Sequence, residues 1–78
     1  ERYQEAAQLF QQALPIYREV NNRRGEANAL LGYARALRDL GESDKARAAY
    51  EEAQRVYEAL GLTHESRLAA EEAKALNL

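Results

Sequence analysis

Three short breaks divide the sequence into four segments with helical character. The breaks are Asn21-Asn22, Gly41-Glu42-Ser43 and Gly61-Leu62-Thr63. Each contains a glycine or asparagine that can adopt positive φ at a helix end, followed by a residue of N-cap type (Asn22, Ser43 or Thr63). We therefore expect helices at about 2–20, 23–40, 44–60 and 64–76. Because the connections are so short, consecutive helices must run antiparallel.

The composition supports an all-α fold and excludes several classes of function. Alanine and leucine account for 27 residues, whereas valine, isoleucine and threonine, which favour strands, account for four. The absence of cysteine excludes disulfides, catalytic thiols and cysteine-containing zinc sites. A net charge of −2 gives no overall field to attract nucleic acid or an anionic membrane. With no long apolar run and no recognisable signal peptide, we expect a soluble cytoplasmic protein.

Apolar residues in the third segment recur at helical spacing. They form one stripe on the helical wheel, made of Ala46, Ala49, Tyr50, Ala53, Tyr57 and Leu60. Arg47, Glu51 and Arg55 lie away from the centre of this stripe. We interpret these three residues as a solvated face with weak ion pairs.

A shift of 40 residues superimposes the sequence on itself. Identical pairs are Ala6 and Ala46, Ala13 and Ala53, Tyr17 and Tyr57, and Ala29 and Ala69. Similar pairs are Phe10 and Tyr50, Ile16 and Val56, and Val20 and Leu60. A shift of 34 residues gives no such agreement. One period holds two helices, so each unit is a helix pair that must stack on its neighbours to bury its apolar face.

The residues from Ala29 onward resemble the tetratricopeptide repeat. The resemblance rests on the spacing of Leu30, Tyr33, Ala34, Leu37, Gly41, Ala46, Tyr50 and Ala53. Two positions depart from the family pattern, because Leu30 replaces tryptophan and no proline closes the unit near Glu58. The sequence is most similar to a longer variant of about 40 residues, as in bacterial regulatory and signalling proteins. The resemblance implies antiparallel helix-turn-helix repeats stacked as an α-α superhelix.

The same resemblance divides the chain into parts of three repeats. Residues 2–20 correspond to the second helix of a preceding repeat, 23–60 to one complete repeat, and 64–76 to the first helix of a following repeat. The match weakens in the last helix, where Ala70, Ala73, Lys74 and Asn77 occupy the signature positions. Because the sequence opens at Glu1 and closes at Leu78 without capping signals, we expect residues 1–78 to be a segment of a longer array.

Pro15 lies within the first predicted helix. Its counterpart one period later is Arg55, on the side away from the apolar stripe, so we expect Pro15 on the outer side of the array. The sequence predicts a bend between Gln11 and Pro15, not a break, because long helices already curve in that direction. A hinge is the alternative.

One stripe of the second helix is left over after the apolar residues are assigned to packing. It contains Arg24, Asn28, Leu31, Arg35 and Arg38. The core set on the other side is Ala27, Leu30, Tyr33, Ala34, Leu37 and Leu40. A strip of small residues between them, made of Gly25, Ala29, Gly32 and Ala36, should let a neighbouring helix approach closely. In this pattern neither packing surface requires the stripe that begins at Arg24.

The family resemblance implies that the first helix of each unit lines a concave groove. Arg35 and Arg38 could then hold a carboxylate or an acidic side chain while Leu31 contacts an apolar anchor. The corresponding stripe of the last helix is His64, Leu68, Glu71, Ala75 and Leu78, of which we include Leu68 and Glu71 in the predicted partner-binding set. The alternative is that Arg35 and Arg38 only solvate the helix end, with Asp39 and Glu42 neutralising Arg38 and Arg35.

Other functional sites are disfavoured. The carboxylate clamp of chaperone-binding family members would need lysine at Leu31 and asparagine at Arg35. His64 is a lone histidine, Glu51-Glu52 and Glu71-Glu72 diverge on their helices, and Gly25 and Gly32 form no phosphate-binding loop. We therefore predict no catalytic residue, no metal site and no cofactor.

Two hypotheses for function remain, and a third, that the protein is an enzyme, is disfavoured. The first is a protein-protein interaction scaffold that binds a peptide or helix, with an acidic or carboxylate group as a possible feature of the partner. The second is a structural spacer or a self-association module that pairs through uncapped end helices. Neither hypothesis involves nucleic acid or a membrane.

Overall fold

The computed structural model describes residues 2–76, which form four antiparallel helices and no strand. The helices are α1 (Arg2–Glu19), α2 (Arg23–Asp39), α3 (Ser43–Ala59) and α4 (Thr63–Ala75). Every predicted helix boundary is confirmed to within one residue. Predictions about Glu1, Asn77 and Leu78 lie outside the described residues.

All three turns have the same geometry. Asn21, Gly41 and Gly61 have φ values of 58°, 82° and 74°, as the sequence predicted for helix ends. The next residue donates its N–H to a carbonyl five residues back, in the pairs Asn22–Tyr17 (2.8 Å), Glu42–Leu37 (2.9 Å) and Leu62–Tyr57 (2.9 Å). These bonds satisfy carbonyls that a helix end would leave unpaired. The repeated turn gives each helix the same reversal of direction.

The helix starts agree only partly with the predicted caps. Asn22 is an N-cap, because its Oδ1 accepts the N–H of Gly25 at 2.8 Å. Ser43 and Thr63 are not: the N-cap positions are Glu42 and Leu62, neither of which makes a side-chain capping bond. Only two residues, Leu40 and Gly41 or Leu60 and Gly61, lie between the last helical residue and the next N-cap. The residue after each glycine therefore already occupies the N-cap position. Ser43 and Thr63 are therefore the first helical residues.

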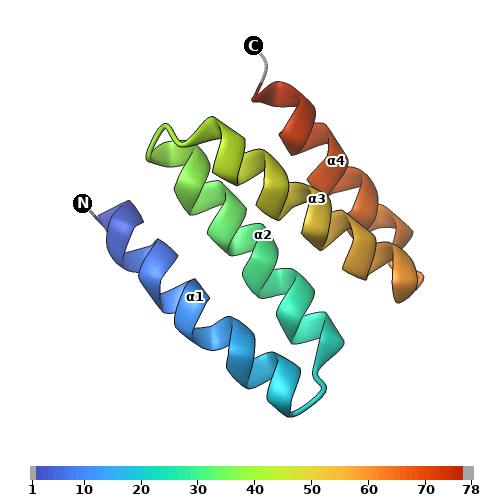
Figure 1. The fold of residues 1–78 in the computed structure, drawn as a ribbon. Coiled ribbons are helices and arrows are strands. Elements are labelled where there is room, and N and C mark those ends of the chain that lie inside the picture. The colour runs from blue at the N-terminus through green and yellow to red at the C-terminus, as the bar shows by residue number, and fades with distance from the viewer. Residues whose placement is uncertain (1, 77–78) are drawn as a thin grey trace.

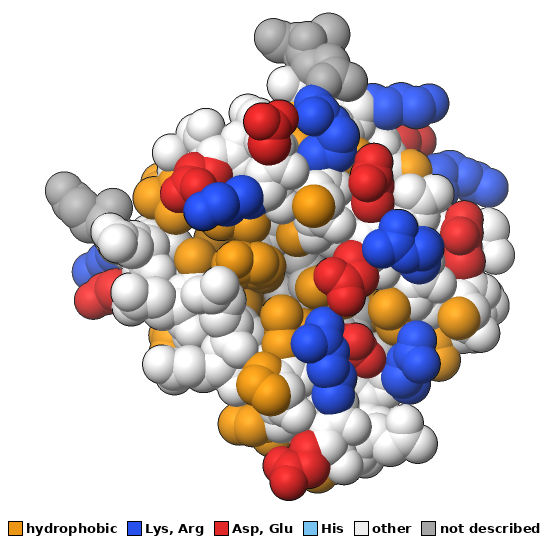
Figure 2. Space-filling model, in the orientation of Figure 1, with side chains coloured by type: hydrophobic (Ala, Val, Ile, Leu, Met, Phe, Trp, Pro, Cys, Tyr) orange, Lys and Arg blue, Asp and Glu red, His pale blue; other side chains and the backbone are white. Residues whose placement is uncertain are grey.

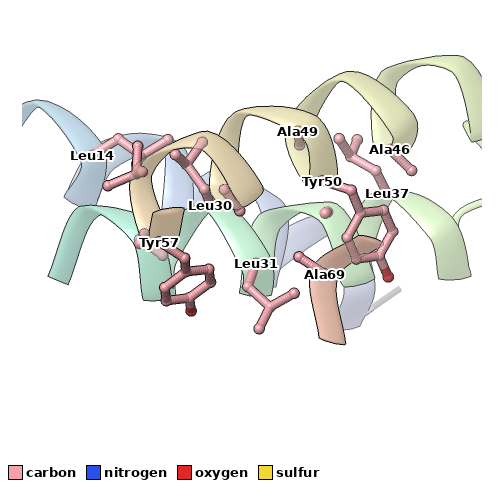
Figure 3. Packing of buried hydrophobic residues seen from close by; sticks show 14 residues of the cluster. Leu14, Leu30, Leu31, Leu37, Ala46, Ala49, Tyr50, Tyr57 and Ala69 are labelled. Carbon is pink, nitrogen blue, oxygen red and sulfur yellow. The ribbon is translucent and has the colours of Figure 1, made fainter. Parts of the chain in front are cut away.

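The helices lie side by side in chain order, with α2 against α1 and α3, and α3 against α4 (Figure 1). The largest fully buried side chains are Tyr50 and Tyr57 of α3, which lie in one cluster with residues of all four helices (Figure 3). The predicted α3 stripe is buried except for Leu60, which remains 40% exposed at the helix end. In α1, Ala6 is only partly buried although its counterpart Ala46 is fully buried, and Ala7 is buried instead.

The small-residue strip of α2 allows close packing of α1, as predicted. A Cβ atom placed on Gly25 would lie 2.5 Å from the ring of Tyr17, and one on Gly32 would lie 2.4 Å from the ring of Phe10. Both distances are shorter than any tolerable carbon–carbon contact. Two aromatic rings of α1 therefore occupy the volume that side chains at Gly25 and Gly32 would need.

Pro15 does not break α1. The helix continues through it from Arg2 to Glu19, and Pro15 is exposed, as is Arg55 one period later. This exposure agrees with the predicted outer position. The bend itself stays a prediction.

Candidate partner-binding face

The predicted stripe of α2 lies beside α4, and Glu72 of α4 makes the strongest contacts to it. Arg35 donates two hydrogen bonds to the Glu72 carboxylate, from Nε to Oε1 at 2.9 Å and from Nη2 to Oε2 at 2.6 Å. The hydroxyl of Tyr50 donates to Oε1 at 2.9 Å. A two-point arginine–carboxylate contact is among the stronger polar contacts in proteins. The network joins α2, α3 and α4.

Protonation states in this network match its hydrogen bonds. The hydrogen bond from Arg35 holds the pKa of Glu72 below its ordinary value, and the same bond raises the pKa of Arg35. Burial, together with the hydrogen bond to Glu72, raises the pKa of Tyr50 to about 12. At neutral pH Glu72 is therefore a carboxylate, Arg35 a cation and Tyr50 a neutral donor.

Arg38 lies at the edge of the same network. Its Nε donates to Asp39 at 3.1 Å, and its Nη1 lies 3.3 Å from the Tyr50 hydroxyl and 3.5 Å from Glu72. The predicted neutralisation of Arg38 by Asp39 is confirmed. That of Arg35 by Glu42 is wrong, because Arg35 faces α4 while Glu42, on the turn, lies 3.1 Å from Lys45.

Arg24 and Asn28 occupy the other end of the stripe. The Arg24 side chain is 65% exposed, and its ion pair within the described residues is with Glu65 of α4 at an Nη2–Oε2 distance of 3.7 Å. The Asn28 Oδ1 accepts the hydroxyl of Tyr57 at 2.6 Å. Burial raises the pKa of Tyr57, so this hydroxyl stays protonated and able to donate. The bond uses the oxygen of the Asn28 amide and leaves its two N–H donors without a partner among residues 2–76.

We use the name α2–α4 face for the surface formed by these polar residues and those facing them. It consists of Arg24, Asn28, Arg35 and Arg38 of α2 with Glu65, Leu68 and Glu72 of α4. On this face the arginines of α2 lie opposite Glu65 and Glu72 of α4. Figure 2 shows the side of the molecule on which α3 lies in front of α4; charged side chains of both signs are interspersed there too, and hydrophobic side chains gather nearer α1. The face is thus of mixed charge, as the lack of basic residues in the α4 stripe predicted.

Two pockets adjoin α2. One of about 200 Å³ lies between α1 and α2 next to Asn28, and its other lining residues are Phe10, Ala13, Tyr17, Gly25 and Ala29. The second, of about 270 Å³, lies between α1, α2 and α3 and is lined in part by Leu30, Tyr33 and Ala48. Leu30 and Tyr33 are on the side of α2 opposite the stripe, so only the smaller pocket adjoins the α2–α4 face.

The described residues contain no feature of a metal site or of a membrane span. No three His, Asp or Glu side chains among residues 2–76 are grouped so that they could hold a metal ion. Over the same range, no helix combines the length and apolar character needed to cross a membrane. Every buried side-chain nitrogen and oxygen there has a hydrogen-bond partner.

Comparison with protein families agrees with the geometry. The sequence model described as "Tetratricopeptide repeat" matches residues 1–59, which span α1, α2 and α3. The chain belongs to the tetratricopeptide repeat family. Comparisons with curated proteins and with solved structures give no significant match. Proteins of this family generally act as non-catalytic scaffolds that mediate protein-protein interaction.

Within this tetratricopeptide chain, Leu31 is not where the sequence pattern placed it. Leu31 is 8% exposed and belongs to the buried cluster that includes Ala69 of α4, near which it lies in Figure 3. It is therefore unavailable as the expected contact for an apolar anchor. The stripe was interpreted as one that no packing surface needs, and that interpretation is wrong because α4 covers Leu31 and binds Arg35.

The predicted residues of α4 are placed less centrally. Leu68 is partly buried, and Glu71 is exposed and pairs with no described residue. His64 and Ala75 are also exposed, which agrees with a solvated histidine. The structure brings Arg24, Asn28, Arg35 and Arg38 together on one side of α2, whereas Glu71 stays apart from them.

Sequence reasoning missed the two glutamates that bind the arginines. Glu65 and Glu72 are seven residues apart on α4, and the 40-residue shift places them on Gly25 and Gly32. Two glycines of the small-residue strip are thus glutamates in the next unit, which indicates that these positions have different roles in the two units. The sequence analysis identifies Glu72 only as one member of the adjacent pair Glu71-Glu72.

Proposed function

We propose that this tetratricopeptide chain is a protein-protein interaction module that binds a peptide or helix of a partner through the α2–α4 face. One observation carries the proposal: exposed hydrogen-bond donors without a strong partner among residues 2–76 lie on helices that a hydrogen-bond network holds together. Asn28 and Arg24 are exposed, whereas Arg35, Tyr50 and Glu72 connect the helices beneath the same face. Pre-positioned donors lose little freedom on binding.

The arrangement favours a partner segment with acidic groups. Arg35 is held by Glu72, and Arg38 is shared between Asp39 and the Tyr50 hydroxyl. Among residues 2–76, Arg24 pairs only with Glu65, at 3.7 Å. A partner carboxylate can therefore displace Glu65 from Arg24 more easily than it can displace the groups that hold Arg35 and Arg38. This assignment moves the expected acid-binding position from Arg35 and Arg38 toward Arg24.

The proposal includes the context expected from the sequence. Residues 2–20 are the second helix of one repeat, 23–60 a complete repeat and 64–76 the first helix of the next. The module acts without catalysis or a cofactor, in the cytoplasm, as part of a larger bacterial regulatory protein. The similarity of the segment to long bacterial repeats supports this context.

The proposed function is tested with peptides selected from a random library on the wild-type chain. Their affinities are measured by fluorescence anisotropy for Arg24→Glu and for Arg55→Glu, a matched charge reversal on the outer side of α3. Loss of about tenfold or more in affinity is expected for Arg24→Glu alone, since a desolvated arginine contact is worth that much. Equal affinities for the two variants would contradict the proposed binding face.

A second candidate function, self-association, is favoured by one specific observation. Leu9 and Ile16 lie on one face of α1 and are 65% and 60% exposed, and Val20, directly after the helix, is 65% exposed. Their counterparts one period later include Ala49 and Val56, which are buried in α3 between two helices. An apolar face of this kind is typical of a surface that packs against another helix.

Sedimentation over a range of protein concentrations tests this second candidate. If α1 pairs with another copy, the mass increases with concentration, and Ile16→Glu abolishes the increase. Ile16 is exposed, so the variant should fold normally. A monomer at every concentration would exclude self-association and leave the peptide-binding proposal in place.

A further inference from the structure

The pocket between α1 and α2 has apolar walls and a polar rim. The rings of Phe10 and Tyr17 come from α1, and Ala13, Gly25 and Ala29 contribute only methyl groups or backbone. Asn28 lies at the side toward the α2–α4 face, and its N–H donors bind no other described residue. The pocket therefore combines an apolar cavity with a hydrogen-bond donor at its edge, which is typical of a site for a side chain and its backbone.

The second unit shows why the pocket exists. The 40-residue shift places Tyr50 and Tyr57 on Phe10 and Tyr17, and these two tyrosines are fully buried whereas Phe10 and Tyr17 are only half-buried. The same shift replaces Gly25 by Glu65 and Asn28 by Leu68. The equivalent position between α3 and α4 thus carries larger side chains. The opening beside α1 follows from the small residue at Gly25 and the polar one at Asn28.

The pocket cannot be closed by a side chain from Gly25. Its Cβ would lie 2.5 Å from the Tyr17 ring and 3.0 Å from Cγ of the capping Asn22, so any substitution would displace one of them. The floor is therefore fixed by the packing of α1 on α2. A pre-formed cavity needs no rearrangement to accept a ligand, which favours binding.

We propose that this pocket receives one aliphatic side chain of a bound peptide whose neighbouring acidic residue pairs with Arg24. The inference rests on the proposed function and specifies the chemistry of the partner. A volume of about 200 Å³ is sufficient, since apolar cavities of about 150 Å³ take up benzene. The Asn28 amide donates to a carbonyl of the peptide backbone beside the inserted residue.

Charge at this end of α2 fits an acidic partner. Arg24 lies one turn before Asn28 on the same side of the helix and is largely exposed. The nearby carboxylate of Glu26 is already occupied by Arg18 at 2.9 Å and by Arg23 at 3.5 Å. Among residues 2–76, only Glu65, at 3.7 Å, competes for Arg24. A peptide carboxylate can therefore approach Arg24 without meeting an unpaired acidic group of α2.

Two substitutions fill the pocket, of which Ala13→Leu removes no hydrogen bond, whereas Asn28→Leu also removes the acceptor of the Tyr57 hydroxyl. Ala13→Leu fills it from α1, and Asn28→Leu copies the residue found at the equivalent position of α4. The matched control is Ala48→Leu, which introduces the same side chain at the exposed rim of the 270 Å³ pocket on the opposite side of α2. Filling an open apolar cavity commonly leaves stability unchanged or raises it.

The experiment uses the peptides selected from a random library on the complete wild-type chain. We expect them to share an aliphatic residue close to Asp or Glu, and to bind Ala13→Leu and Asn28→Leu about tenfold more weakly while binding Ala48→Leu normally. Replacing the aliphatic residue of the peptide by alanine should cost a similar factor on the wild type. That peptide change tests the pocket even if a protein variant fails to fold.

Each outcome separates this inference from the proposed function. Peptides that lose affinity for Arg24→Glu but bind Ala13→Leu and Ala48→Leu equally well would overturn the pocket assignment and support the binding face. Selected peptides without an aliphatic residue would also overturn it. Peptides insensitive to Arg24→Glu and to both pocket-filling variants would overturn the pocket and the face together.

Discussion

At the scale of single residues, Glu72 connects three helices through one carboxylate. Its two oxygens accept from Arg35 and Tyr50, and Arg38 lies 3.5 Å away. The Glu72 side chain is only 18% exposed, so its hydrogen bonds are partly protected from competing water. Removing an acceptor from such a network leaves a guanidinium and a hydroxyl without their partner.

Glu72→Gln should lower the free energy of unfolding by about 1–2 kcal/mol, because the charge-assisted bonds to Arg35 are lost while Arg35 stays partly solvated. Urea denaturation measures the change. Glu71→Gln is the control, since Glu71 is exposed on the same helix without a described partner. Equal stabilities of the two variants would show that the network contributes nothing to folding.

Glu72 also predicts how stability depends on pH. Its folded-state pKa is held below the ordinary value of 4.5 by the hydrogen bond from Arg35. The stabilisation is therefore complete above about pH 4.5 and is lost as pH falls through the lower, folded-state pKa. Urea midpoints measured from neutral to acidic pH should fall less steeply for Glu72→Gln than for the wild type. Parallel curves would contradict the assigned shift.

At the scale of helices, the packing of α1 on α2 depends on the absence of side chains at Gly25 and Gly32. The rings of Tyr17 and Phe10 lie where their Cβ atoms would be. In an open helix, alanine in place of glycine would stabilise by about 1 kcal/mol. Here the same change must move a ring, so the sign should reverse.

Gly32→Ala is expected to destabilise the chain by about 1–3 kcal/mol through overpacking against Phe10. In the background of Phe10→Ala the same substitution should instead be neutral or stabilising, which gives a coupling of about 1 kcal/mol or more in a double-mutant cycle. Denaturant unfolding of the four proteins measures it. Additive effects of the two changes would exclude the close contact.

The predictability of these elements differed for physical reasons. Helix ends were predictable because Asn21, Gly41 and Gly61 carry a local backbone requirement for positive φ. The position of Leu31 was not, because the wheel of α2 does not reveal that α4 will cover it. Glu72 and Arg35 are 37 residues apart in the sequence and on different helices. Their contact depends on how the two helices pack, which the residue spacing within one helix cannot show.

At the scale of the whole molecule, the core is small and is centred on α3. Tyr50 and Tyr57 are its largest fully buried side chains, and the other fully buried positions are alanines at helix contacts. A chain of this length rarely has more than about 3–5 kcal/mol of stability from one core. Loss of one large core residue should therefore affect the entire fold.

Tyr50→Ala should unfold the chain, because truncating a buried aromatic residue costs about 3–5 kcal/mol. Circular dichroism is expected to show loss of helix at room temperature. Tyr3→Ala, at an exposed tyrosine of α1, should change stability by less than about 0.5 kcal/mol. A folded Tyr50→Ala with a normal melting temperature would mean that the core does not depend on α3.

The central claim is that the α2–α4 face binds a partner peptide, and an amide chemical-shift map tests it most directly. A selected peptide is titrated into isotopically labelled protein while backbone amide signals are recorded. The account predicts the largest shifts around Arg24 and Asn28 of α2 and Leu68 of α4. Largest shifts around Leu9 and Ile16 on the outer side of α1, with α2 and α4 unchanged, would contradict it.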